Sequence, residues 1–157
     1  MKKLLVAVAC SLVLSVAFAA DTAVNEKVLK TFKETFADVK NEEWFQDGDQ
    51  FTVRFVRNEI DTRITYDEDA NILSTIRYYK GKHLPAMILG KLNRKYTDKW
   101  VFGVTETSNE EGTQYHITLE DKENWMVVVS DSNGSMRVEK KFKREDLAPL
   151  CAPAPLR

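Results

Sequence analysis

The segment that comes nearest to a metal site is Asp67-Glu68-Asp69-Ala70-Asn71. It supplies oxygen ligands at the first, third and fifth positions of a calcium loop. The sixth position is Ile72, where such a loop needs glycine, and the twelfth is Tyr78, where it needs a bidentate glutamate. We therefore predict a hairpin turn built from residues that tolerate a left-handed backbone, rather than a calcium site.

The other side chains able to do chemistry are scattered. The two histidines, His83 and His116, are far apart in sequence and have no neighbouring ligand at zinc spacing. Paired carboxylates occur at Glu42-Glu43, Glu110-Glu111 and Glu145-Asp146, at predicted strand entries, turns or chain ends, where exposure to solvent gives no reason for the shifted pKa that acid/base catalysis needs. The sequence has neither a G-x-S-x-G motif nor a phosphate-binding glycine loop. We predict no enzyme activity, no cofactor and no metal.

The first 20 residues predict a secretory signal peptide. Lys2-Lys3 precedes an apolar run over residues 4–18, and small residues lead to a cleavage point at or next to Ala20. This run is shorter than the ~20 residues that span a bilayer, so we expect no membrane anchor after cleavage. The alternative is a lipidation box ending at Cys10, but the apolar run continues past that cysteine. We predict export to the periplasm, or secretion.

Charge bounds the class of partner. Residues 21–157 carry 21 basic and 24 acidic side chains, a formal net charge of −3. This balance argues against a nucleic-acid partner, because nucleic-acid binding normally needs a basic excess. Segment 77–99 has seven basic and one acidic side chain, a net charge of +6. Within it, Lys91, Arg94 and Lys95 form a predicted secondary basic surface for an acidic partner or an anionic glycan, the alternative being an ordinary solvated helix face.

One cysteine, Cys151, follows the predicted signal peptide, so residues 21–157 cannot form an intramolecular disulfide. We therefore expect hydrophobic packing to hold a single domain over residues 21–146. The Pro/Ala-rich tail, residues 147–157, is predicted to be disordered. Whether Cys151 is a reactive thiol, an intermolecular bridge or an idle side chain stays open.

Two similar patterns of apolar residues divide the domain into repeats over about residues 24–79 and 84–142. Each begins with a four-residue spacing that predicts an amphipathic helix, over about residues 23–38 in the first and after Pro85 in the second. Four segments of short strand character follow each helix. We expect an α+β fold, a tandem repeat of a helix plus four antiparallel strands, with the helices packed on one face of the sheet and the other face open. The helix residues expected in the core are Phe32, Phe36, Leu92 and Tyr96.

The order of several motifs resembles the PepSY-like and β-lactamase-inhibitor-like (BLIP-like) domains of exported bacterial proteins. The motifs are Phe32-x3-Phe36, Trp44, the strand over residues 51–55, the turn over residues 66–72, and Leu84-Pro85. The resemblance covers about residues 24–143 and implies a tandem repeat whose antiparallel sheet has an open, often concave face. The β-lactamase inhibitors themselves have a disulfide in each repeat, which this chain cannot form, and no inhibitory loop matches. We do not expect direct inhibition of a β-lactamase.

Alternation along the strands predicts which side chains the open face presents. If the apolar residues of segment 51–55 face the helices, Arg54 faces away, and the same rule turns His116 to the open side. The strand of Trp125 is apolar on both faces, so either Trp125 or Met126 is open. Such a face has the composition of a recognition surface. The predicted binding residues are Arg54, Arg63, Tyr79, His116 and Trp125.

These features predict an exported binding or inhibitory module that recognises an envelope protein or peptide through its open sheet face. The alternatives are an envelope structural or stress-response factor without a defined ligand and an uncharacterised enzyme. Coverage of the face by a partner domain, a dimer mate or the tail is an equal explanation for its composition. No motif identifies the partner, an inhibitory role or the oligomeric state.

Overall fold

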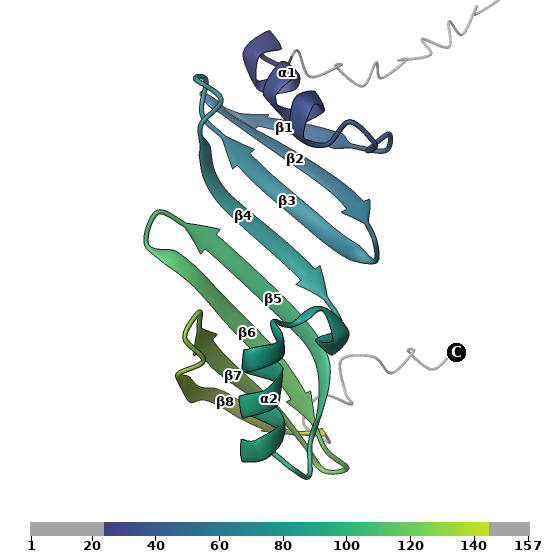
Figure 1. The fold of residues 1–157 in the computed structure, drawn as a ribbon, viewed down its shortest axis with the longest axis vertical. Helices are drawn as coiled ribbons and strands as arrows, with labels where there is room; N and C mark the ends of the chain where they lie inside the picture. The colour runs from purple at the N-terminus through teal and green to yellow at the C-terminus, as the bar shows by residue number, and fades with distance from the viewer. Residues whose placement is uncertain (1–23, 145–157) are drawn as a thin grey trace, which may run out of the picture.

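The computed structural model describes residues 24–144, which form one antiparallel sheet of eight strands and two α-helices (Figure 1). The strands lie in the sheet in the order of the sequence, β1 to β8. Neither helix of this part of the chain is long and apolar enough to cross a membrane. The predicted signal peptide, the tail and Cys151 lie outside the described residues. The expected α+β class with an antiparallel sheet and two helices is confirmed.

The chain passes through a helix and four strands, then through a second helix and four more strands. The first half comprises α1 (Glu26–Thr35), β1 (Glu43–Asp47), β2 (Gln50–Arg57), β3 (Ile60–Tyr66) and β4 (Ile72–Tyr79). The second half comprises a short 3-10 turn, η1 (Gly81–His83), then α2 (Ala86–Lys95), β5 (Trp100–Asn109), β6 (Gly112–Glu120), β7 (Asn124–Asp131) and β8 (Met136–Lys143).

Local signals set the ends of the helices. The Asn25 side chain accepts a hydrogen bond from the Lys27 N–H at 2.9 Å and caps α1. The helix ends at Phe36, whose φ of −125° is not helical and whose N–H donates to the Phe32 carbonyl at 2.8 Å. The second helix ends in the same way at Tyr96. α1 is therefore ten residues long, and the wider predicted range of 23–38 is wrong at both ends.

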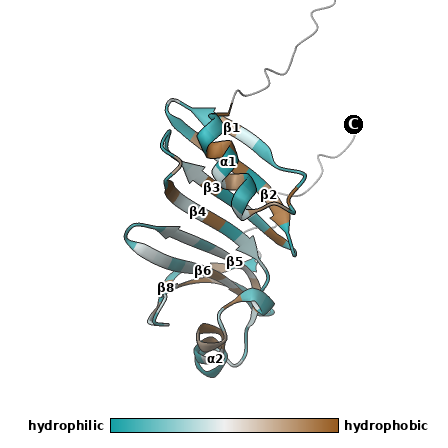
Figure 2. Cartoon of the chain, turned by 45° about the horizontal axis from the view of Figure 1, so that its top comes forward, coloured by the Kyte–Doolittle hydropathy of each residue, from teal (hydrophilic) through white to brown (hydrophobic). Residues whose placement is uncertain are grey.

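Both helices lie on the same face of the sheet. Residues directly opposite each other in an antiparallel pair share a face, and the pairs Ile64–Thr75 and Tyr79–Val104 continue one face from β3 to β5. Ile64 packs in the cluster under α1, whereas Tyr79 and Val104 pack in the cluster under α2. Figures 1 and 2 show the two helices well apart, with β4 and β5 between them. We call this side the helix face and the other side the open face.

The apolar side chains form two separate clusters, one under each helix. The strands change between hydrophilic and hydrophobic colours along their length (Figure 2), as alternation requires. Phe32 and Leu92 are fully buried, as predicted, while Phe36 and Tyr96 pack only partly buried at the ends of their helices. The first cluster is Val28, Phe32, Val39, Phe51, Val53, Phe55, Ile64 and Tyr66. The second is Tyr79, Leu84, Ile88, Leu92, Val104, Tyr115, Ile117, Leu119, Met126 and Val128.

The calcium-like segment is a hairpin turn between β3 and β4. Asp67 Oδ1 accepts hydrogen bonds from the backbone N–H groups of Asp69 (2.9 Å) and Asn71 (2.8 Å), and Ala70 has a φ of +65°. Asp131 Oδ1 accepts from the N–H groups two and four residues further on, both at 2.9 Å, in the β7–β8 turn. The Asp67 carboxylate therefore accepts hydrogen bonds from the backbone of its own turn. No group of three His, Cys, Asp or Glu residues suited to a metal occurs between residues 24 and 144.

A bulge in β5 changes which side chains reach the open face. The β5–β6 register shifts between Val101 and Gly103, so that Val101 lies opposite Leu119 on the helix face while Phe102 turns to the open face. Gly81 packs directly against this bulge, since a Cβ added there would lie 2.8 Å from the Val101 Cβ. The absence of a side chain at Gly81 therefore lets η1 approach β5.

Gly81→Ala is expected to lower the free energy of unfolding by about 1–3 kcal/mol, because the added methyl group overpacks against Val101. Urea unfolding of the purified domain measures this loss. Gly90→Ala on α2 is the matched control, since a Cβ added there would lie 3.8 Å from Arg94 Nη1 and alanine favours a helix. Wild-type stability of Gly81→Ala would contradict the close contact between η1 and the bulge.

Candidate functional site

Aromatic side chains form a row across the open face at one end of the sheet. Trp100 on β5, Glu120 on β6, Trp125 on β7 and Phe142 on β8 are successive cross-strand partners, so they share a face. Phe102 meets Trp125 edge-on, with 4.6 Å between the ring centroids. The exposed fractions of Trp100, Phe102 and Phe142 are 52%, 47% and 39%. We call Trp100, Phe102, Trp125 and Phe142 the aromatic patch.

Cationic side chains border the aromatic patch. The Lys80 ammonium lies 4.6 Å from the centre of the Phe102 ring, and the Arg144 guanidinium lies 5.0 Å from that of Trp125. Glu120 links the two sides of the row, because it accepts a hydrogen bond from the Trp100 indole N–H at 2.8 Å and lies 3.3 Å from Arg144. The patch is therefore an apolar surface with a positive rim, held by cation–π contacts.

The other end of the open face has a paired arginine. The Arg54 side chain binds the Asp61 carboxylate with two nitrogens, at 3.2 Å and 2.7 Å. Hydrogen bonding to this guanidinium holds the pKa of Asp61 below its ordinary value. Arg63 lies with its guanidinium 5.7 Å from the centre of the exposed Tyr78 ring. The arginines here are fixed in place by their neighbours, which favours a preorganised surface.

His116 lies between these two ends. It is paired with Thr105 on β5 and Val129 on β7, and its Nδ1 is 3.6 Å from a Glu139 carboxylate oxygen. Burial also shows which side chains of the Trp125 strand face the helices, a choice that the sequence does not make. Met126 packs in the core of the helix face, so Trp125 faces the open side. The structure places four of the predicted binding residues, Arg54, Arg63, His116 and Trp125, on the open face.

The prediction that Tyr79 lies on the open face is wrong. Tyr79 is only 5% exposed and packs on the helix face opposite Val104. Its hydroxyl donates to Glu106 at 2.5 Å, and Arg77 lies 3.0 Å from the other oxygen of the same carboxylate. Burial and this hydrogen bond raise the pKa of Tyr79 far above its usual range. The neighbouring Tyr78 holds the open-face position instead.

Sequence reasoning missed Trp100 and Phe102 as surface residues. Trp100, Phe102 and Val104 are spaced two residues apart, which predicts that all three share one face of the sheet. The bulge instead turns Trp100 and Phe102 to the open face, while Val104 stays on the helix face. The signal that would have found this is Gly103, since an isolated glycine within a strand pattern is typical of a bulge.

The predicted basic surface on α2 has structural partners. Lys91 Nζ donates to the Asn133 carbonyl at 2.7 Å, and Lys95 Nζ donates to the Met136 carbonyl at 3.2 Å. These bonds tie α2 to the β7–β8 hairpin. Arg94 lies exposed on the same helix. Two of the three cations are thus used in packing the helix end against the sheet.

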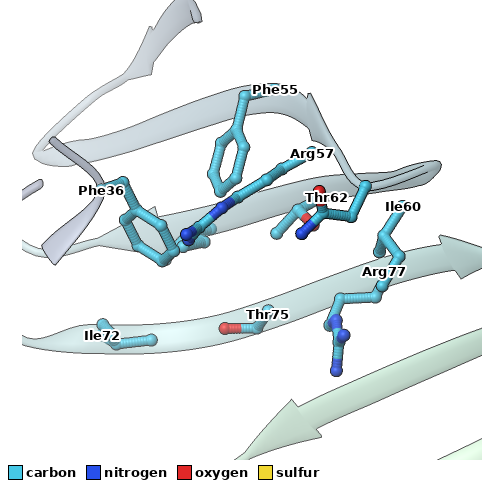
Figure 3. A pocket seen from close by; sticks show the side chains of 10 residues that line it. Phe36, Phe55, Arg57, Ile60, Thr62, Ile72, Thr75 and Arg77 are labelled. Atoms are coloured by element: carbon cyan, nitrogen blue, oxygen red, sulfur yellow. The ribbon is translucent and has the colours of Figure 1, made fainter. Parts of the chain in front are cut away.

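A hollow of about 380 Å³ lies on the helix face beside the end of α1. Figure 3 shows Arg57 extending past Phe55 toward Phe36, and Arg77 turned toward β5. Arg57 Nε lies 3.0 Å from Asp38, and Arg77 binds Glu106, so both arginines already have a carboxylate partner. The lining residues are Phe36, Phe55, Arg57, Asn58, Ile60, Thr62, Ile64, Ile72, Thr75 and Arg77.

The fold defines an α+β protein with one open antiparallel sheet. No family model and no curated protein matches the sequence. Among solved structures, it is similar to a BLIP-like protein from Bacteroides fragilis, with a TM-score of 0.54 and 17% identity over 75% of this chain and 84% of that one. It is also similar to a DUF2874 family protein from Bacteroides uniformis, with a TM-score of 0.55 and 13% identity over 76% of this chain and 89% of that one. A candidate periplasmic protein from Bacteroides eggerthii has a TM-score of 0.54 and 19% identity over 75% of this chain and 87% of that one. The chain therefore has a BLIP-like fold.

Proposed function

We propose that the protein is exported and binds another protein or an extended peptide through its open sheet face, without catalysis. The observation that carries this proposal is the placement of exposed apolar side chains. Of the ten large apolar side chains exposed within residues 24–144, six lie on the open face. Aromatic side chains and arginine are enriched at the centres of protein interfaces. The six are Phe45, Val56, Tyr78, Trp100, Phe102 and Phe142.

Export to the periplasm is supported by two observations. Residues 1–20 have the sequence pattern of a signal peptide. A structure with the same fold belongs to a candidate periplasmic protein. An envelope protein or peptide is therefore the class of partner that the open face would meet.

We further propose that the two halves are copies of one PepSY-like unit. The aspartate-centred turns at Asp67 and Asp131 have the same hydrogen bonds to residues two and four positions further on. Phe36 and Tyr96 end their helices with the same backbone bond. Repeated local geometry at matching positions of the two halves supports duplication of a helix and four strands.

Binding should depend on the aromatic patch. The chain over residues 21–157 serves as bait in a pull-down from the native periplasm, and mass spectrometry identifies the partner. Replacing Trp100 and Trp125 by alanine is expected to weaken the affinity for that partner at least tenfold, about 1.4 kcal/mol, because aromatic anchors dominate binding energy. Titration calorimetry with the purified partner measures the dissociation constant.

Two controls separate this face from the rest of the surface. Met87→Ala removes a half-exposed apolar side chain from α2 and should leave the affinity unchanged. Charge reversal at Arg94 tests the basic surface without breaking the hairpin contacts of the lysines. Loss of binding with reversed Arg94, together with full binding by the tryptophan variants, would place the docking surface on α2 and refute the proposal.

A further inference from the structure

The end of β8 lies beside the aromatic patch. β8 ends at Lys143, and the next residue, Arg144, is held by three contacts in addition to its ion pair with Glu120. Its backbone N–H donates to the Glu123 carbonyl at 2.8 Å, its Nη1 donates to the Asp121 carbonyl at 2.8 Å, and its guanidinium lies over Trp125. The chain therefore leaves the sheet from a fixed point at the edge of the patch.

The turn that holds Arg144 is itself well anchored. Asp121 Oδ1 accepts hydrogen bonds from the backbone N–H groups of Glu123 (2.8 Å) and Asn124 (2.7 Å), and its other oxygen binds the Lys99 ammonium. These donors hold the pKa of Asp121 well below its ordinary value. The carboxylate remains charged, and the turn intact, at neutral pH.

The sequence beyond this point complements the patch. In the sequence, Glu145-Asp146 directly follows Arg144, which forms the positive rim together with Lys80. The apolar and proline residues that follow are Leu147, Pro149, Leu150, Pro153, Pro155 and Leu156. Proline-rich segments favour the extended polyproline II conformation, which aromatic-lined surfaces bind at low entropic cost. Acidic residues followed by leucine and proline therefore match a cation-bordered aromatic surface.

We propose that segment 147–156 folds back across the open face and covers the aromatic patch of its own molecule. Ten residues in polyproline II span about 31 Å. Crossing from β8 to β5 requires three strand spacings, roughly 15 Å. A segment tethered at the edge of its site also has an effective concentration in the millimolar range, which favours this occupant over a second copy.

The inference goes beyond the proposed function and does not rest on it, since the tail covers the patch whether or not a partner exists. Where a partner does bind the patch, it must first displace the tail.

A spin label on Cys151 tests the inference directly. In the chain over residues 21–157, which includes every described residue, Cys151 is the sole cysteine. A nitroxide attached there is expected to remove most of the NMR intensity of the amides of Phe102, Trp125 and Phe142, because relaxation enhancement falls steeply with distance. The amides of α1, on the helix face, should keep their intensity.

Matched variants show what holds the tail. Replacing Leu147 and Leu150 by serine should restore the lost intensities, whereas replacing Ala148 and Ala152 by serine should leave the broadening in place. A second sample mixes the spin-labelled chain with an isotope-labelled Cys151→Ser chain, in which no broadening is expected. Broadening in the mixed sample would show that a second copy is the occupant and overturn the proposal. Intensities that fall equally on all surfaces, or not at all on the patch, would overturn it as well.

Discussion

Phe32→Ala is expected to lower the free energy of unfolding by about 3–5 kcal/mol, the range for a large buried side chain truncated in a packed core. Phe32 is 0% exposed, and its ring centroid lies 5.2 Å from that of Phe36, 5.3 Å from that of Trp44 and 5.5 Å from that of Phe55. Truncation removes burial and three aromatic contacts together. Urea unfolding followed by circular dichroism measures the loss.

Leu29→Ala is the control for this effect. Leu29 lies on the same helix, α1, but is 36% exposed and outside the buried cluster. Alanine has a high helix propensity, so this change is expected to cost less than about 1 kcal/mol. Similar losses for Leu29→Ala and Phe32→Ala would show that the two side chains are equally buried and would contradict the orientation of α1.

Leu92→Ala is expected to cost about 2–5 kcal/mol, because it opens a cavity in the second cluster. Leu92 of α2 is buried among residues of β5, β6 and β7, whereas Phe32 packs only with residues of the first half. The two clusters share no member. Each truncation should therefore have its first effect in its own half of the sheet.

Hydrogen exchange resolves where each truncation acts. In Leu92→Ala, amides of β6 and β7 should exchange faster than those of β2 and β3, and Phe32→Ala should show the reverse. The halves are joined through the β4–β5 pairing, from Thr75–Ser108 to Tyr79–Val104. Uniform acceleration across all strands in both variants would mean that this pairing makes the sheet one cooperative unit and would refute separate effects.

Much of the fold could be predicted because the signals are local. The four-residue spacing of Val28 and Phe32 predicts a buried helix stripe, and alternation about Val53 and Phe55 predicts that Arg54 faces away from it. The turn at Asp67 follows from side chains that bond their own backbone. These features depend on neighbours within a few residues, and the structure has them where the sequence predicts them.

The open-face residues could be predicted only where one register is clearly polar. Arg54 and His116 interrupt apolar runs, so alternation assigns them correctly. In β4 and β7 both registers contain apolar residues, so the sequence predicts the wrong face for Tyr79 and assigns no face to Trp125. Alternation defines two sets of side chains in a strand but does not say which set meets the helices.

The sequence by itself determined the two helices, the strand character of the segments after them and the turn chemistry, because these depend on local propensity and periodicity. Only the tertiary structure decided which face each strand presents and where the aromatic patch lies. Cross-strand pairing joins Trp100, Trp125 and Phe142 into one row, although they lie on three different strands. The β5 bulge adds Phe102 to that row, and it is stabilised by packing of Gly81 against Val101, a contact between segments 20 residues apart. Such contacts depend on the register of the whole sheet, which no local window of sequence contains.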